Sequence, residues 1–261
     1  MTTPQLVPIQ LNAANPDKPL LVVGPGIGTG VQELWDPTVA HLDADFEVIG
    51  YDLPGHVIAP TSTAPYSVKE LADAVAKIAK QSAAGREVYF AGVSISGGVA
   101  LELALHHPET FTAVAVVCSA AKIGEPEAWE ERAEIAAQNG TEVMIPFCRD
   151  GWFAPGFHEA QPAKADTLLG ILRDADLDSY VTVCRALGTY DMRADLPKIT
   201  LPVLAINGAH DEVCPPSGGE VIAAGVPQGK ALVFENTAHL APVEEPMRTA
   251  DELRTFFLTA S

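Results

Sequence analysis

The sequence predicts an α/β fold: a mostly parallel sheet, flanked by helices, with an inserted helical cap. Three observations lead to this class. Apolar runs alternate with amphipathic segments along much of the chain, which is the pattern of strands joined by crossover helices. The run from Glu87 to Glu109 reads as a buried strand, a sharp turn and a helix. From Ser119 to Pro202 the strand pattern stops and only helix-like segments appear.

The core elements can be assigned in chain order. Early strands are expected in the runs QLVPIQL, PLLVV and FEVIGY, which lie within residues 5–51. Residues 67–84 are expected to form a helix, because Ser67 and Glu70 make a capping box and apolar residues recur at helical spacing. The run TAVAVVC, residues 112–118, is typical of a strand buried on both faces. Two later strands are expected in LPVLAING, residues 201–208, and in ALVF, residues 231–234.

The segment without strands contains helix-like stretches near residues 127–138, 163–173 and 177–187. It is too long for one crossover connection. We therefore interpret residues 122–195 as a helical cap, inserted between two parts of the core, residues 1–121 and 196–261.

The turn in the run EVYFAGVSISGG carries Ser94 and has the form of a nucleophile elbow. Such a turn lifts a serine oxygen to the top of a parallel sheet, where a histidine and backbone N–H groups can reach it. The usual pattern is G-x-S-x-G, and Ser96 stands here in place of the last glycine. A small residue is needed there because strand and helix approach closely. Ser94 is the predicted nucleophile, and the N–H of Ile95, the next residue, is predicted to bind the oxyanion.

An acid and a base for Ser94 are expected in the loops after the last two strands, in the order Ser, Asp, His. Asp211 follows Gly208 by three residues, and His239 follows the strand at residues 231–234. Glu212 is a close rival of Asp211, but Asp211 is preferred for its spacing from Gly208. Among the seven histidines, the lesser rivals of His239 are His56 and His210.

Composition limits the partners that this chain can have. Its 34 acidic and 16 basic residues give a formal charge of −18, which argues against nucleic acid or anionic membrane as partners. No leader-like start and no run of about eighteen apolar residues is present, so neither secretion nor a membrane span is indicated. The four cysteines lack C-x-x-C spacing, which fits reduced thiols in a cytoplasmic protein rather than disulfides or a zinc site. We expect no metal and no cofactor, and the sequence leaves the oligomeric state open.

The chain resembles the α/β-hydrolase superfamily over nearly its whole length and, within it, the 3-oxoadipate enol-lactonases. The superfamily resemblance rests on the elbow and on the runs FEVIGYDLPGH, GAHDEVCPP and TAHLAPVEEP. The narrower one rests on DPTVAHLDADFEVIGYDLPGH, on RDGWFAPGF, similar to R-W-F-T-P-x-F, and on LDSYVTVCRAL followed by ADLPKITLPVLAINGAHDEVCPP. Departures from the family pattern are Pro54, Val57, Ser96 and Gly151, and none of them removes a triad residue.

The resemblance selects a second oxyanion donor, the N–H of Ile27, in the loop VVGPGIGTG. The glycines of this loop also allow a rival reading as a dinucleotide-binding turn. That reading fits poorly, because Gly24, Gly26 and Gly28 recur at every second position and no glycine stands at Thr29.

The resemblance implies a serine hydrolase that opens 3-oxoadipate enol-lactone, a small molecule with a free carboxylate. An acidic chain needs a local cation to bind it. Seven basic residues lie in the cap, and Arg149 is the preferred candidate, because it is close to Trp152 in the matching segment. Trp152 is expected to line the pocket or to anchor the cap. A general carboxylesterase and a binding protein without turnover stay open as alternatives.

Overall fold

The computed structural model describes residues 3–260, so residues 1, 2 and 261 of the predicted core lie outside the described part. The α/β class is confirmed by a seven-stranded sheet of order β1-β3-β2-β4-β5-β6-β7. Only β1 runs antiparallel to its neighbour, β3; the other neighbouring strands are parallel. The strands are β1 (Ile9–Gln10), β2 (Leu20–Gly24), β3 (Glu47–Gly50), β4 (Val88–Val93), β5 (Ala113–Val117), β6 (Val203–Gly208) and β7 (Gly229–Phe234).

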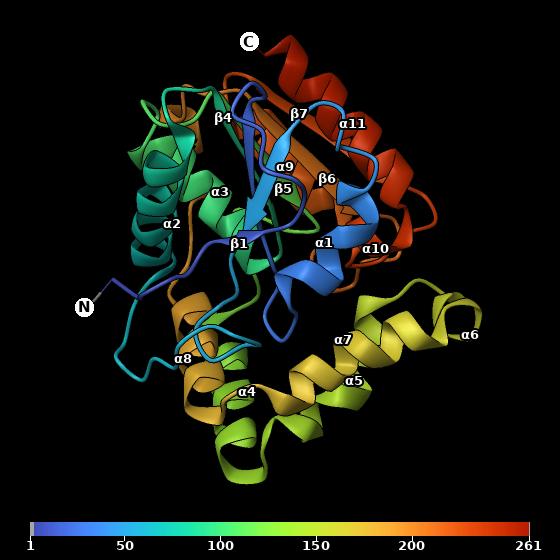
Figure 1. The fold of residues 1–261 in the computed structure, drawn as a ribbon. Helices are drawn as coiled ribbons and strands as arrows, with labels where there is room; N and C mark the ends of the chain where they lie inside the picture. Colours follow the sequence, from blue (N-terminus) through green and yellow to red (C-terminus); the bar gives the residue numbers. More distant parts are fainter. Residues whose placement is uncertain (1–2, 261) are drawn as a thin grey trace.

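Helices cover both faces of the sheet (Figure 1). One face carries α2 (Val68–Ala83), α3 (Ile95–His106) and α9 (Pro216–Gly225), and the other carries α1 (Val31–Val39) and α11 (Pro246–Thr259), with the short α10 (Ala241–Glu244) beside them. All residues of β2, β4, β5 and β6 are buried, as expected for central parallel strands. The carboxyl ends of these strands therefore form a rigid edge on which loops can position functional groups.

The predicted helix at residues 67–84 is confirmed as α2. Ser67 accepts from the backbone N–H of Glu70, and the Glu70 carboxylate accepts from the N–H of Ser67, so the capping box is present. The predicted first strand is reduced to Ile9–Gln10, directly after Pro8, which cannot donate a ladder hydrogen bond. Helices α1, α9 and α11 were not predicted; proline interrupts the pattern of α1 and glycine that of α9, whereas α11 contains proline only at its start.

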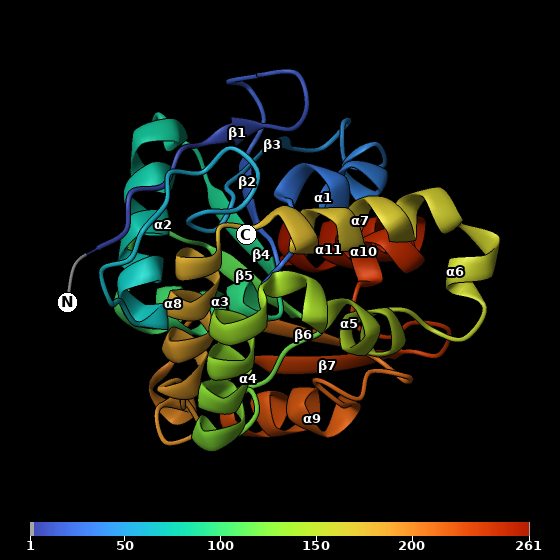
Figure 2. The same cartoon turned by 90° about the horizontal axis from the view of Figure 1, so that it is seen from below.

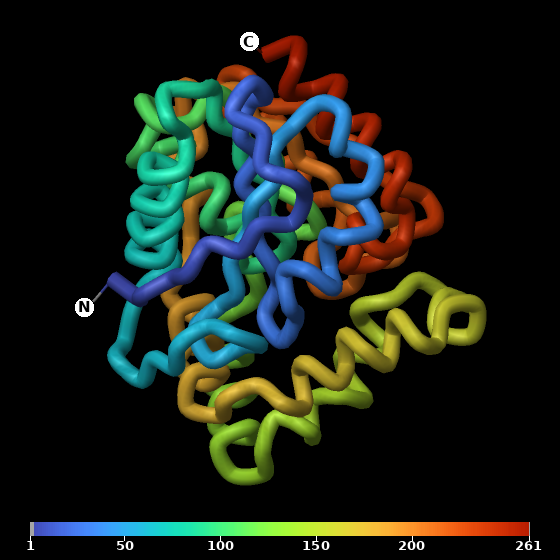
Figure 3. Tube along the Cα trace, viewed as in Figure 1, coloured from blue at the N-terminus to red at the C-terminus, as the bar shows by residue number. Residues whose placement is uncertain are grey.

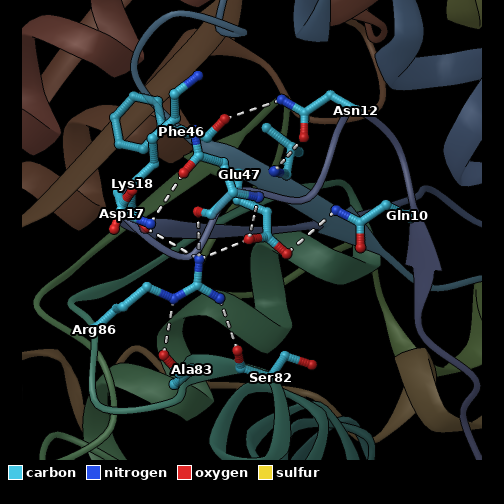
Figure 4. A network of polar contacts seen from close by, with 11 residues as sticks. Gln10, Asn12, Asp17, Lys18, Phe46, Glu47, Ser82, Ala83 and Arg86 are labelled. Atoms are coloured by element: carbon cyan, nitrogen blue, oxygen red, sulfur yellow. Dashed lines mark hydrogen bonds and ion pairs between the residues drawn. The ribbon is translucent and has the colours of Figure 1, made fainter.

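A polar network closes the amino ends of β3 and β4 (Figure 4). Arg86 pairs with Glu47 at 2.7 Å and donates to the carbonyls of Ser82 and Ala83. Both side chains of the pair are mostly buried, so each carboxylate oxygen and guanidinium nitrogen needs its partner. Because this network lies at the sheet edge opposite to Ser94, we assign it to stability.

Helices α4 (Pro126–Asn139), α5 (Ile145–Trp152), α6 (Phe157–Ala160), α7 (Pro162–Asp174) and α8 (Leu177–Gly188) lie between β5 and β6 in the chain. Figures 1 and 2 show them gathered below the sheet, at the carboxyl ends of its strands. The three predicted helical stretches correspond to α4, α7 and α8, while α5 and α6 were not predicted. The boundaries of a separate cap at residues 122 and 195 stay an interpretation.

The long loop between β3 and α2 lies against the start of α8, as the trace in Figure 3 shows. The N–H of Asp176 donates to the carbonyl of Gly55 at 2.9 Å, and the N–H of Ser62 donates to the Ser179 hydroxyl at 3.0 Å. These bonds connect the α4–α8 segment to the core.

All four cysteines are free and buried. Among residues 3–260, no helix is long and apolar enough to cross a membrane.

Candidate active site

Ser94 lies at the tight turn between β4 and α3, with φ of 57° and ψ of −119°. A non-glycine residue at positive φ costs about 1–3 kcal/mol, so surrounding contacts must hold it there. The N–H of Ser94 donates to the carbonyl of Val117 at 3.0 Å, and its carbonyl accepts from the Ser119 hydroxyl at 2.7 Å. The strained backbone is therefore fixed from the neighbouring strand β5.

Bare backbone on both sides of the serine makes this turn possible. A Cβ at Gly92 would lie 2.1 Å from the Ser96 carbonyl oxygen, and a Cβ at Gly97 would lie 2.4 Å from the Ser119 Cβ. Both distances are below any real contact, so these two positions require glycine. The turn has the geometry that the sequence predicted for a nucleophile elbow.

His239 and Asp211 form a buried pair. His239 Nδ1 lies 2.8 Å from Asp211 Oδ2, and both side chains are almost fully buried. The other carboxylate oxygen of Asp211 accepts from the N–H groups of Val213 and Cys214 at 2.9 and 2.8 Å. With its acceptor sites occupied in this way, Asp211 can hold the proton of His239 on Nδ1 and leave Nε2 free as a base.

The rival residues are placed elsewhere. Glu212 and His210 are exposed. His56 is buried, but its Nε2 accepts from the N–H of Gly28 at 3.0 Å and its Nδ1 lies 3.0 Å from the Pro54 carbonyl. Burial lowers the pKa of His56, so the ring stays neutral. The two hydrogen bonds occupy both of its ring nitrogens. His56 therefore supports the loop that contains Gly28 rather than acting as a base.

Ser94 and His239 line one small cavity of about 10 Å³, the space of a single water molecule. Its walls come from the core and from the helical segment, and include Ile27, Ser94, Trp129, Arg132, Trp152 and His239. The structure thus brings Ser94, His239, Ile27 and Trp152 together at one point, with Asp211 behind His239.

The two predicted oxyanion donors lie beside this cavity. Ile95 is the first residue of α3, so its N–H has no partner within the helix. Ile27 lies in the loop after β2, and a Cβ on the preceding Gly26 would be 3.4 Å from the Ser94 Cβ. Both backbone segments therefore approach Ser94 closely. Their role as oxyanion donors is a proposal developed below.

Ser96, which replaces the elbow glycine, makes specific hydrogen bonds. Its hydroxyl donates to the Pro25 carbonyl at 2.6 Å and accepts from the Tyr51 hydroxyl at 2.9 Å. A Cβ at Gly24 would lie 2.6 Å from Ser96 Oγ, so bare backbone at Gly24 makes room for this serine. Ser96 thereby connects α3 to the loop that carries Ile27.

We expect Ser96→Ala to lower kcat by up to about tenfold while leaving the fold intact, because the buried hydrogen bonds to the Pro25 carbonyl and from the Tyr51 hydroxyl are lost, each worth about 1 kcal/mol. Steady-state kinetics and denaturant unfolding check this. Tyr51→Phe keeps the bond from Ser96 to Pro25 and should be milder. A loss as large as that of Ser94→Ala would mean that the register of the elbow is wrong.

Trp152 both lines the cavity and connects the helical segment to the core. Its carbonyl accepts from the backbone N–H of His239 at 3.1 Å, and its ring would be 3.3 Å from a Cβ on Gly28. Both readings of this residue from the sequence are thus compatible with its position.

Glu244 also connects the helical segment to the loop that carries His239. Its carboxylate accepts from the N–H groups of Ala238 and Leu240, on either side of His239, and from the N–H of Ala154 at 2.6 Å. Burial raises the pKa of Glu244 to about 7, although the three N–H donors favour the charged form. Glu244 was not predicted from the sequence. The one signal for it there is a carboxylate five residues after the candidate base His239.

Arg149, the preferred substrate-binding cation, is exposed and is not among the residues that line the cavity. Arg132 of α4 lines it instead. Its Nε donates to the Tyr180 hydroxyl at 2.8 Å, and the guanidinium lies 5.4 Å from the ring centroids of Trp129 and Phe147. The geometry therefore favours Arg132 over Arg149.

Arg132 also differs from the other basic residues of this segment in its charge partners. Four of them pair with acids: Lys122 with Glu125, Arg173 with Asp174, Arg185 with Glu130, and Arg193 with Asp191. Lys164 and Arg149 are exposed. Within residues 3–260, no carboxylate lies within 4.0 Å of the Arg132 guanidinium. A sequence signal existed, because Arg132 shares the face of α4 that buries Trp129 and Ala133.

The family model described as "Alpha/beta hydrolase family" matches residues 20–252. The chain belongs to this family. The hydrolase is 32% identical to 3-oxoadipate enol-lactonase 2 of Acinetobacter baylyi over 230 residues, which cover 88% of this chain and 85% of the relative. It is 28% identical to 3-oxoadipate enol-lactonase 1 of the same organism, over 91% and 88% of the two chains.

Among solved structures, the hydrolase superposes on the enol-lactonase from Burkholderia xenovorans LB400 with a TM-score of 0.89 and 25% identity, covering 97% of this chain and 96% of that one. The predicted α/β-hydrolase fold and the resemblance to enol-lactonases are thereby confirmed.

Proposed function

We propose that this hydrolase cleaves a small ester or lactone that carries an acidic group, with 3-oxoadipate enol-lactone as the first candidate. The proposal is carried by one observation: His239, which is paired with Asp211, lines the same cavity as Ser94 and Arg132, and Arg132 has no acidic partner within residues 3–260. The similarity to enol-lactonases over most of the chain supports the substrate.

In the proposed mechanism, His239 Nε2 takes the proton from Ser94 as its oxygen attacks the lactone carbonyl. Asp211 keeps the imidazole oriented and stabilises its positive charge. The N–H groups of Ile27 and Ile95 stabilise the tetrahedral oxyanion, and each such donor is worth about 3 kcal/mol of barrier height.

Collapse of the tetrahedral intermediate breaks the ring C–O bond and leaves an enolate, which takes the proton from His239 and becomes a ketone, so that His239 is neutral again. The acyl group stays on Ser94 as an ester. Water, deprotonated by His239, then attacks this ester, releases 3-oxoadipate and returns the proton to Ser94. An enolate is a good leaving group, so ring opening needs little assistance.

The free carboxylate of the substrate needs a cation, because a chain of charge −18 repels it at long range. Arg132 is the proposed partner. It has no acidic partner among the described residues, and it lines the cavity together with Ser94. A charge-assisted bond to the substrate would replace its missing ion pair.

A substrate comparison tests this function. We expect kcat/KM for 3-oxoadipate enol-lactone to exceed that for p-nitrophenyl acetate, which lacks the carboxylate. A preference for the neutral ester would indicate a general carboxylesterase, and hydrolysis of neither, in folded protein, would indicate a binding protein. The cytoplasmic location expected from the sequence stays a prediction.

A further inference from the structure

A second, larger cavity opens beside the cavity at Ser94. It has a volume of about 520 Å³, within the range of small-molecule sites. Most of its lining is apolar and comes from α4 and the segments on either side of it: Ile123, Trp129, Ile135, Val143, Met144 and Phe147. We call this cavity the apolar chamber.

The apolar chamber adjoins the candidate active site. Trp129, Arg132, Phe147 and Val213 line both cavities. The space beside Ser94 itself holds no more than a water-sized group, whereas the chamber can hold a substituent of many atoms. Of these two spaces, the chamber is the one with room for the bulk of a substrate whose carbonyl lies at Ser94.

The position of Arg132 indicates where the acidic and the apolar groups of a substrate would lie. Arg132 stands at the junction of the two cavities, and its guanidinium lies between the rings of Trp129 and Phe147. The one carboxylate that lines the chamber, Glu131, belongs to an exposed residue of α4. An anion at the junction is thus attracted by Arg132, and the space beyond it favours apolar groups.

Large apolar side chains are exposed at the chamber. Phe147 is 57% exposed, and Ile135 and Val143 are each 41% exposed. Ligand-binding sites are concave and mostly apolar, and exposed apolar side chains around a hollow are typical of them. The four lining residues that the chamber shares with the candidate active site favour part of the substrate as its occupant.

We propose that the apolar chamber is a subsite for an alkyl or aryl substituent of the substrate, with the acidic group at Arg132 and the reactive carbonyl at Ser94. This inference rests on the proposed hydrolase function and narrows its substrate class. Among acidic lactones and esters, those that add an alkyl or aryl group to the framework of 3-oxoadipate enol-lactone are then expected to bind more tightly than the lactone itself.

Calorimetric titration with acetate, butyrate, hexanoate and octanoate tests the subsite without requiring turnover. We expect the dissociation constant to fall about threefold for each added methylene, because each methylene leaves water for the chamber. Ala128→Phe fills the chamber, which Ala128 lines, and should remove this trend. Ala137→Phe is the matched control, since Ala137 is exposed on the same helix and does not line the chamber.

Equal affinity for all four carboxylates, or the same trend in both variants, would overturn the subsite. So would a dimer in light scattering that Ala128→Phe converts to monomers, because the chamber would then be an interface between two copies. Chain-length-dependent binding without hydrolysis of any ester would instead overturn the proposed function and support the subsite. Hydrolysis of the lactone without chain-length dependence would do the reverse.

Discussion

Replacement of Ser94 by alanine is expected to lower kcat by about four orders of magnitude or more, and His239→Ala is expected to do the same. Neither change should unfold the protein, since both residues lie at the carboxyl edge of the sheet, outside its apolar core. The double variant should be no worse than either single one, because the two side chains act on the same proton transfer. Steady-state kinetics on the preferred substrate measure all three.

The control for these variants is Ser119→Ala, which removes a hydrogen bond to the Ser94 backbone carbonyl but keeps the side chains of Ser94 and His239. It should keep far more activity than Ser94→Ala. Circular dichroism and denaturant unfolding establish that each variant is folded. Near-normal turnover by folded Ser94→Ala or His239→Ala would rule out the proposed mechanism.

Arg132→Met is expected to lower kcat/KM for the anionic lactone about ten- to a hundredfold, mainly by raising KM. A charge-assisted hydrogen bond is worth about 1.5–3 kcal/mol, and methionine replaces much of the packing volume of arginine without its charge. Hydrolysis of neutral p-nitrophenyl acetate should change little. The ratio of the two specificity constants is therefore the measurement.

Arg149→Met is the matched control, because Arg149 is an exposed cation of the neighbouring helix α5 and does not line the cavity. It should leave both substrates unaffected. An equal loss on both substrates in Arg132→Met would mean that Arg132 acts by holding Tyr180 and the helical segment together. If Arg149→Met instead lowers kcat/KM for the anionic lactone alone, Arg149, the residue that the sequence favoured, binds the substrate carboxylate.

The elements that position Ser94, His239 and Asp211 could be predicted from the sequence because each depends on local chemistry. Ser94 follows a buried strand and precedes an Ala- and Leu-rich helix, and glycine is required at Gly92. Asp211 and His239 follow their strands by a few residues, so the parallel sheet brings them to one edge. The pairing of the parallel strands therefore places residues from separate loops in one site.

The wall of the cavity could not be predicted in the same way. Arg132 and Arg149 are both arginines of the same inserted segment, and only the packing of α4 against α8 decides which one faces Ser94. The role of Ser96 was equally hidden, because it appeared as a tolerated departure from glycine. Its hydroxyl contacts Pro25, which is 71 residues away in the chain, and no local pattern reports such a contact.

Labelling with a fluorophosphonate, followed by peptide mapping, tests the activation of Ser94 most directly. The probe reacts with a serine only where a base accepts its proton and oxyanion donors are in place. We expect a single adduct on Ser94 in the folded wild-type protein, and no adduct in His239→Ala within the same time. An unreactive Ser94 in folded protein, or an adduct on Ser96 or another serine, would contradict the assignment of Ser94, His239 and Asp211 as the catalytic residues.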